Sequence, residues 1–206
     1  MDHHRKVIKN MRDTDFVFQT RQQLLDMYVN LTFSQCNILD VGGGSNSVIH
    51  NLRSLEIPAD VYCLETDDFI QARKTISNLD DDVTFISFNQ LSMIDADVVY
   101  FGSVIQYFHD FSKIVDIIQC VSPPSVIIGG TILTDEENIE GVYAQPSSNG
   151  GFQAYTIRHK NSVSEFFKSI GYYKRFETPE AEVLINLQNA KHAPIAWFQI
   201  YEYFDK

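Results

Sequence analysis

Short apolar segments alternate with amphipathic helical segments along most of this 206-residue chain. The helical segments carry apolar residues three or four positions apart, as a helix with one buried face requires. The expected strands are residues 37–41, 60–65, 83–88, 96–101, 125–128, 172–177 and 195–204, and the expected helices are residues 13–33, 46–55, 69–77, 111–118 and 162–170. Right-handed crossovers between parallel strands place helices on both faces of a sheet. The pattern therefore predicts an α/β fold with a mostly parallel seven-stranded sheet.

The length and the lack of any low-complexity linker predict a single domain. Residues 134–156 show no clean period and are expected to be irregular. No stretch approaches the roughly 18 apolar residues of a membrane span, and the polar segment Met1–Thr20 lacks the apolar core of a secretory signal. The three cysteines are odd in number and widely spaced, which is typical of reduced thiols. These features predict a cytoplasmic protein.

Charge argues against polyanionic partners. The chain has 16 Lys and Arg against 27 Asp and Glu, and a net charge of −11. A face that binds a nucleic-acid backbone needs clustered basic residues, whereas those of this chain are scattered. The six histidines show no metal-ligand spacing with the cysteines. Neither a nucleic-acid partner nor a metal is expected.

A glycine run joins the first expected strand to the next helix, in the order Asp40-Val41-Gly42-Gly43-Gly44-Ser45-Asn46. Successive glycines at this place indicate a tight turn that lets a ligand approach the backbone. A dinucleotide loop would need a third glycine at Ser47, and a phosphate-binding P-loop would need a lysine nearby. Both are missing, whereas another pattern, an acidic residue followed by x-Gly-x-Gly, fits Asp40, Gly42 and Gly44.

Polar residues follow the other expected strands, where ligands of a parallel sheet bind. Glu65 ends the second strand, and its carboxylate can accept hydrogen bonds from both hydroxyls of a ribose. Asp67 and Asp68 follow closely and can share or take that role. Glu65 thus indicates an adenosine-like ligand without naming it. Nicotinamide oxidoreductases of the short-chain class need Tyr-x-x-x-Lys, and none of the ten tyrosines has a lysine four positions on.

The pattern Asp40-x-Gly42-x-Gly44 resembles the class I S-adenosylmethionine-dependent methyltransferases, over about residues 37–204. The resemblance implies a single-domain Rossmann-like methyltransferase fold, with residues 35–206 binding the cofactor and residues 1–34 forming a helical lid. It implies S-adenosylmethionine as cofactor and S-adenosylhomocysteine as product. The family's usual third glycine corresponds to Asn46. The cofactor-binding residues that it implies are Asp40, Gly42, Gly43, Gly44, Asn46, Glu65, Asn89 and Ser103.

Two short strings, Gly102-Ser103-x-x-Gln106-Tyr107 and Gly141-Val142-Tyr143-Ala144-Gln145, are similar more narrowly to a bacterial family of small methyltransferases. This likeness implies an acceptor that is a small molecule or a sugar-type metabolite. The chain has no Asn-Pro-Pro-Tyr or Asp-Pro-Pro-Tyr motif, which disfavours methylation of nucleic-acid bases. A monomer or a homodimer is expected.

The expected catalytic residues are His109, Tyr107 and Gln106, which follow the fourth expected strand. Gln106 and Tyr107 are expected to face the acceptor, and His109 is the first candidate for a general base, with His159 and Asp135 behind it. Two other functions stay open. One is cyclisation of S-adenosylmethionine, as in azetidine-2-carboxylate synthases, and the other is a non-catalytic cofactor-binding subunit.

Overall fold

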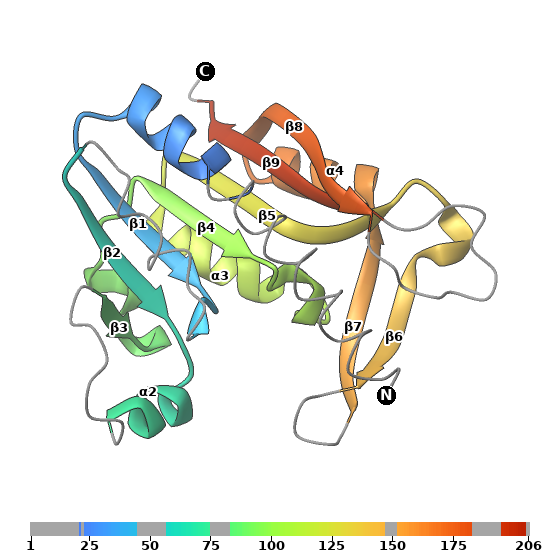
Figure 1. Ribbon diagram of the computed structural model, residues 1–206, viewed down its shortest axis with the longest axis horizontal. Helices are drawn as coiled ribbons and strands as arrows, with labels where there is room; N and C mark the ends of the chain where they lie inside the picture. The colour runs from blue at the N-terminus through green and yellow to red at the C-terminus, as the bar shows by residue number, and fades with distance from the viewer. Residues whose placement is uncertain are drawn as a thin grey trace, which may run out of the picture.

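The computed structural model describes residues 21, 23–44, 57–74, 83–146, 152–182 and 195–204. A twisted sheet runs through them in the order β3-β2-β1-β4-β5-β9-β8 (Figure 1). The neighbours from β3 to β5 are parallel, and β9 is antiparallel to both β5 and β8. The strands are β1 (Cys36–Val41), β2 (Ala59–Leu64), β3 (Thr84–Ile86), β4 (Val98–Gly102), β5 (Ser125–Thr134), β8 (Tyr172–Glu182) and β9 (Ile195–Tyr203). The prediction of a mostly parallel α/β sheet is confirmed.

The parallel strands end level with one another. Val41 of β1 is opposite Leu64 of β2 and Phe101 of β4, and Leu64 is opposite Ile86 of β3. The segments that follow these strands therefore share one edge, the carboxyl edge of the sheet. Ligands of open α/β sheets bind at such an edge.

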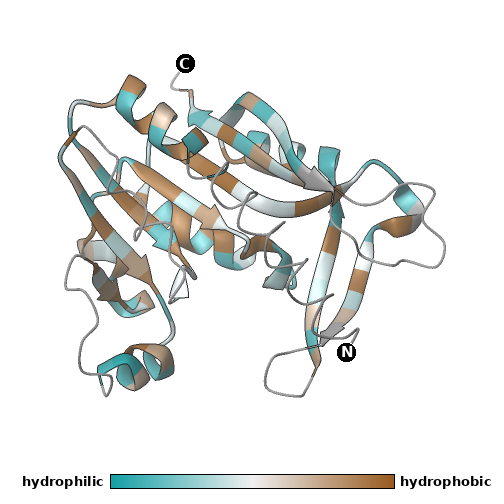
Figure 2. Cartoon of the chain, viewed as in Figure 1, coloured by the Kyte–Doolittle hydropathy of each residue, from teal (hydrophilic) through white to brown (hydrophobic). Residues whose placement is uncertain are grey.

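Both faces of the sheet are covered, as predicted. The helices α3 (Ser112–Val121) and α4 (Lys160–Ser169) pack on one face, and the helical residues 23–32 pack on the other. Buried strands contribute apolar side chains to both layers, which is why β4 and β5 are largely brown at the centre of Figure 2. A further helix, α2 (Asp67–Lys74), follows β2 and has no buried residue. The expected helix 46–55 and residues 13–20 lie outside the described residues.

A hairpin stands where the sequence predicted irregular structure. After β5 and the short turn η5 (Glu137–Ile139), strands β6 (Gly141–Pro146) and β7 (Phe152–His159) pair antiparallel. Tyr155 and Ile157 alternate toward a small apolar cluster with Ile132 and Ile139, a period hidden by the polar residues around them. The expectation of irregularity over 134–156 is therefore wrong, and β5 extends six residues past its expected end at 128. The hairpin β6–β7 pairs with β5 only at Leu133 and Thr134 and extends away from the sheet (Figure 1).

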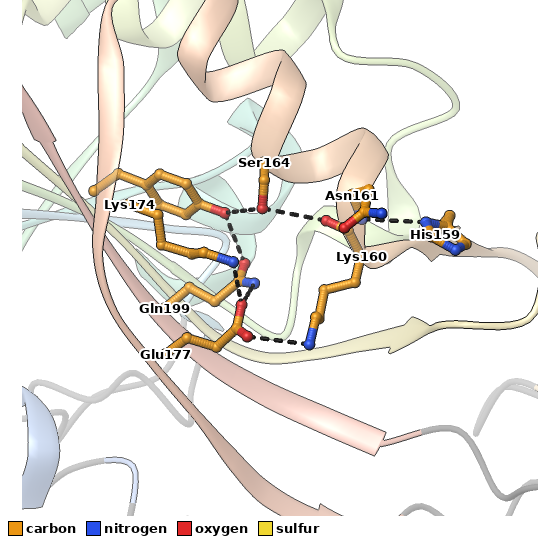
Figure 3. Close-up of polar contacts among 8 residues, drawn as sticks. His159, Lys160, Asn161, Ser164, Lys174, Glu177 and Gln199 are labelled. Carbon is orange, nitrogen blue, oxygen red and sulfur yellow. Dashed lines mark hydrogen bonds and ion pairs between the residues drawn. The ribbon is translucent and has the colours of Figure 1, made fainter.

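A polar network joins α4 to β8 and β9 (Figure 3). The fully buried Gln199 donates to Glu177 Oε2 at 2.9 Å and accepts from the Tyr201 hydroxyl at 3.0 Å. Lys160, in the first turn of α4, forms an ion pair with Glu177 Oε1 at 3.1 Å, and Lys174 pairs with the same carboxylate. The network satisfies groups that would be costly to bury alone.

Candidate functional site

The glycine run forms a tight loop at the end of β1. Gly42 and Gly44 have φ angles of +68° and +58°, a region that side chains with a Cβ rarely adopt. The Gly42 amide donates to the carbonyl of Leu64 at 2.9 Å, which continues the β1–β2 pairing into the loop. A Cβ at Gly42 would lie 2.7 Å from Cγ2 of Val104, so the loop also packs against the segment after β4.

Glu65 directly follows β2, and its side chain contacts the glycine loop. Its Oε1 accepts a hydrogen bond from the Gly44 amide at 2.7 Å, and its own amide donates to Ile86 O at 3.0 Å. Asp67 and Asp68 are instead exposed in the first turn of α2. Of the three acidic residues that sequence reasoning left open, Glu65 is the one that the structure brings to the glycine loop.

Beneath the loop lie two buried side chains of neighbouring strands. Asp40 of β1 is 1% exposed and stands opposite Cys63 of β2, which is fully buried. Burial raises the pKa of the Cys63 thiol, the charges of Asp40 and Glu65 act in the same direction, and the amides of Gly43 and Gly44 oppose them. A thiol held protonated in this way is not a nucleophile. Cys63 is therefore packing beneath the loop.

Two predicted cofactor residues contribute less to the described site. Asn89 lies at the same edge, in the turn η3 (Phe88–Met93) that follows β3, and it is exposed. The neighbouring Ser87 amide donates to the Gln90 side chain at 3.0 Å, which fixes the start of this turn. Asn46 lies outside the described residues.

Ser103, directly after β4, has a φ of +55°, and its amide donates to Gly129 O at 2.7 Å. Its hydroxyl accepts a hydrogen bond from Nη1 of Arg21 at 2.8 Å. Arg21 in turn forms a buried ion pair with Glu180 of β8, with 3.1 Å between Nη2 and Oε2. The predicted cofactor residue is thus held by the N-terminal segment.

Sequence reasoning missed Arg21, although a signal for it exists in β5. Gly129 and Gly130 lie at a β-bulge in this fully buried strand. A Cβ at Gly129 would lie 2.7 Å from Cδ of Arg21, and one at Gly130 would overlap the guanidinium. Because these two glycines have no side chains, they leave the space that Arg21 occupies.

The predicted catalytic residues Gln106 and Tyr107 lie in the turn η4 (Ile105–Tyr107), and His109 lies just after it. Their environments differ. Gln106 is only 3% exposed, and its Nε2 donates to Ser103 O at 2.6 Å. Tyr107 is 38% exposed and meets the ring of Tyr155 edge to face, with 5.6 Å between centroids. His109 is exposed. Gln106 thus braces the loop, whereas Tyr107 and His109 are accessible.

The two secondary base candidates have local structural roles. His159 caps α4, because its Nδ1 accepts from the Asn161 amide at 3.2 Å. Its Nε2 lies 3.3 Å from the carbonyl of Asp135, so both ring nitrogens are engaged. Asp135 itself is exposed beyond the end of β5. Among the base candidates, only His109 lies in the segment that directly follows β4.

A second missed residue is Arg158 of β7, which donates to the backbone carbonyls of Ile105 and Phe108. In the sequence it belongs to the polar run Arg158-His159-Lys160, which is typical of an exposed segment.

Among the residues that the structure describes, no group of three or more His, Cys, Asp or Glu could hold a metal ion. No helix in the described part of the chain is long and apolar enough to cross a membrane.

No protein-family model matches the sequence, and no curated protein matches it. Solved structures do match. A methyltransferase dependent on S-adenosylmethionine from Methanosarcina mazei superposes with a TM-score of 0.63 at 13% identity, over 86% of this chain and 96% of that one. The chain has the class I S-adenosylmethionine-dependent methyltransferase fold.

Two further structures share this methyltransferase fold. The 1,6-didemethyltoxoflavin-N1-methyltransferase of Burkholderia thailandensis, solved with 1,6-didemethyltoxoflavin and S-adenosylhomocysteine, has a TM-score of 0.60 at 11% identity, over 99% of this chain and 87% of that one. A glycopeptide N-methyltransferase has a TM-score of 0.58 at 10% identity, over 89% of each chain. At such identities the likeness establishes the fold, and function rests on the site.

Proposed function

We propose that this protein is an S-adenosylmethionine-dependent methyltransferase that acts in the cytoplasm on a small molecule or a sugar-type metabolite. The observation that carries the proposal is the 2.7 Å contact between the Gly44 amide and the Glu65 carboxylate at the carboxyl edge of this fold. It joins a glycine loop that admits a ligand to a carboxylate that can bind ribose. The Burkholderia structure, which holds S-adenosylhomocysteine and a small-molecule substrate, supports the proposal.

The described residues fit the cofactor. Gly42 and Gly44 leave the loop without side chains where a ligand would approach, and both adopt positive φ angles. Glu65 is half-buried beside them and can exchange its bond to Gly44 for bonds to ribose hydroxyls. Ser103 would border the pocket with its backbone, since its hydroxyl is bonded to Arg21. Asp40, Gly43, Asn46 and Asn89 remain proposed contacts.

When bound, S-adenosylmethionine supplies a methyl group that is already activated by its sulfonium. The protein then has mainly to align the acceptor, and positioning can lower a barrier by about 7–11 kcal/mol. We assign that task to Tyr107, which is accessible and braced by Tyr155. The exposed His109 would take the proton from an acceptor that must lose one, while Gln106 holds the loop that carries both residues.

Titration calorimetry with S-adenosylhomocysteine and with NADH tests the cofactor. We expect S-adenosylhomocysteine to bind, and tighter binding of NADH would contradict the assignment. Mass spectrometry after incubation with S-adenosylmethionine then tests the reaction. S-adenosylhomocysteine that forms only when a cell extract is added supports methyl transfer. Methylthioadenosine formed without an acceptor would indicate cyclisation, and cofactor binding without any product would indicate a non-catalytic subunit.

A further inference from the structure

Arg158 of β7 is a buried cation. Its exposure is 5%, and within the described part of the chain no Asp or Glu forms an ion pair with it. Burial lowers the pKa of its guanidinium, and the charges of Glu140 and Asp110 oppose this only partly. Burial of a charge is costly unless other groups compensate it. The compensation at Arg158 comes from backbone carbonyls.

Three carbonyl oxygens surround the guanidinium, and all belong to one loop. Nη1 donates to Ile105 O at 3.0 Å, while Nη2 donates to Phe108 O at 2.6 Å and to His109 O at 3.3 Å. The guanidinium carbon also lies 4.8 Å from the ring centroid of Phe111, at the start of α3. Arg158 therefore holds both ends of the acceptor-side loop, which we define as residues 104–109.

A second contact joins the same strand to the same loop. Tyr155 and Arg158 are three positions apart on β7, so their side chains leave opposite faces of the strand. The buried Tyr155 meets the ring of Tyr107 edge to face. Side chains from both faces of β7 thus contact the acceptor-side loop. The backbone of β7, by contrast, pairs with β5 only at Leu133 and Thr134.

We propose that Arg158 is a positioning residue that locks the acceptor-side loop to the β6–β7 hairpin, so that the two act as one acceptor-binding unit. The inference rests on the proposed methyltransferase function, because Arg158 acts through Tyr107 and His109 rather than on the reacting atoms. A displacement of about 1 Å in a positioning group can cost about a hundredfold in rate. A buried cation that bonds three carbonyls prevents such a displacement.

The test compares Arg158→Met, Arg158→Lys and the control Arg175→Met. Arg175 is half-exposed on β8, where it pairs with Glu202 of β9. Hydrogen exchange is followed at the amides of Tyr107 and Phe108, which bond Val104 O at 2.9 Å and Ile105 O at 3.1 Å. Affinity for S-adenosylhomocysteine is measured by calorimetry, and transfer is measured from methyl-tritiated S-adenosylmethionine to the small-molecule fraction of a cell extract.

We expect Arg158→Met to accelerate exchange at Tyr107 and Phe108 about tenfold or more, because local opening loses charge-assisted bonds. Transfer should fall by a similar factor while the affinity for S-adenosylhomocysteine stays within about threefold. Arg158→Lys should show a smaller acceleration confined to the same amides, since an ammonium can still bond one or two carbonyls. Arg175→Met should match the parent protein in all three measurements.

Unchanged exchange at both amides in a folded Arg158→Met variant would overturn the proposal. Acceleration spread evenly over the sheet would overturn it as well, because that result marks a general loss of stability. If the methionine variant does not fold, the lysine variant decides in the same way. Failure of the parent protein to bind S-adenosylhomocysteine would refute the proposed function separately. The hydrogen-exchange data would still test whether Arg158 holds the acceptor-side loop.

Discussion

The carboxyl edge of the sheet has two halves that are held together differently. One is the proposed cofactor half, which is the glycine loop 42–44 with Glu65, and the other is the proposed acceptor half, which is the loop 104–109 with the β6–β7 hairpin. In the cofactor half, the loop is fixed by backbone groups and by Glu65, which is 21 residues from Gly44. In the acceptor half, the loop is fixed by the side chain of Arg158, which is 53 residues from Ile105.

This difference teaches where each half is sensitive. A loop with positive φ angles fails when a glycine gains a side chain. A loop held by a buried guanidinium fails when that one residue changes. Substitutions in the cofactor half should therefore change the affinity for the cofactor without unfolding the protein. The experiments below measure affinity and stability separately.

Gly44→Val should have the largest effect. Gly44 has a φ of +58°, and a β-branched residue there is a strained outlier that costs about 1–3 kcal/mol. The valine branches would also enter the space beside Glu65 Oε1, which lies 3.7 Å from the ideal Cβ position. We expect S-adenosylhomocysteine binding to fall by about two decades or more. Calorimetry measures the affinity, and circular dichroism checks that the protein is folded.

Gly171→Ala is the matched control for Gly44→Val. Gly171 also has a positive φ, +92°, but it lies at the end of α4, and its Cβ would be 2.7 Å from Cε2 of Tyr203. We expect this variant to lose stability and to keep its affinity for S-adenosylhomocysteine. A folded Gly44→Val protein with unchanged affinity would mean that the glycine loop is only a turn.

Glu65→Ala should weaken S-adenosylhomocysteine binding by one to two decades without unfolding the protein. Charge-assisted hydrogen bonds contribute about 1.5–3 kcal/mol each, and hydration of the free carboxylate offsets part of this. Glu65→Gln should lose less, because the amide oxygen can still accept a bond. Asp67→Ala should match the parent protein, since Asp67 is exposed in α2. Loss of affinity in Asp67→Ala with none in Glu65→Ala would move the ribose contact to Asp67.

The cofactor half could be read largely from the sequence because its geometry is local. Positive φ angles favour glycine, so Gly42 and Gly44 can be recognised in the sequence, and Glu65 comes directly after the end of a recognisable strand. The parallel sheet was predictable for the same reason, since alternating apolar segments impose it. The hairpin was missed because short, half-exposed strands carry a weak period.

The acceptor half could not be read from the sequence because its contacts join distant residues. Nothing near Arg158 shows that its side chain is buried against Ile105 and Phe108. Arg21 likewise meets Ser103, 82 positions later, through a glycine pair whose purpose is visible only in three dimensions. The sequence marked which residues follow β4, but not which side chains fix them.

The helix α4 directly follows β7 and is joined to β8 by the ion pair between Lys160 and Glu177. Glu177→Gln tests whether this attachment also depends on side chains. Burial raises the pKa of Glu177, but hydrogen bonds from Lys174, Gln199 and Lys160 outweigh it and hold the pKa below its ordinary value of 4.5. The carboxylate thus stabilises the fold above the unfolded pKa, and this contribution is lost as pH falls through the folded pKa. After allowance for solvent screening, we expect the variant to be about 0.5–1 kcal/mol less stable at pH 7.

Urea unfolding at several pH values measures this difference. It should shrink below about pH 4.5 and vanish at more acidic pH, because protonated Glu177 and glutamine are then alike in charge. The affinity for S-adenosylhomocysteine at pH 7 should not change. A stability difference that is constant from pH 7 to pH 3 would show that the charge of Glu177 does not hold α4.

Ser103→Gly should have the smallest effect, and it tests the residue at which the two halves meet. Ser103 has a φ of +55°, which costs a residue with a Cβ about 1–2 kcal/mol and costs glycine little. Glycine therefore relieves strain while it loses the bond from Arg21, so we expect a net change within about 1 kcal/mol. Ser103→Ala loses the same bond and keeps the strain, so it should be about 1 kcal/mol less stable than Ser103→Gly. Because the hydroxyl is bonded to Arg21, both variants should bind S-adenosylhomocysteine within about threefold of the parent protein. Equal losses of tenfold or more in both would instead show that the Ser103 hydroxyl itself contacts the cofactor, and would place Ser103 in the cofactor half.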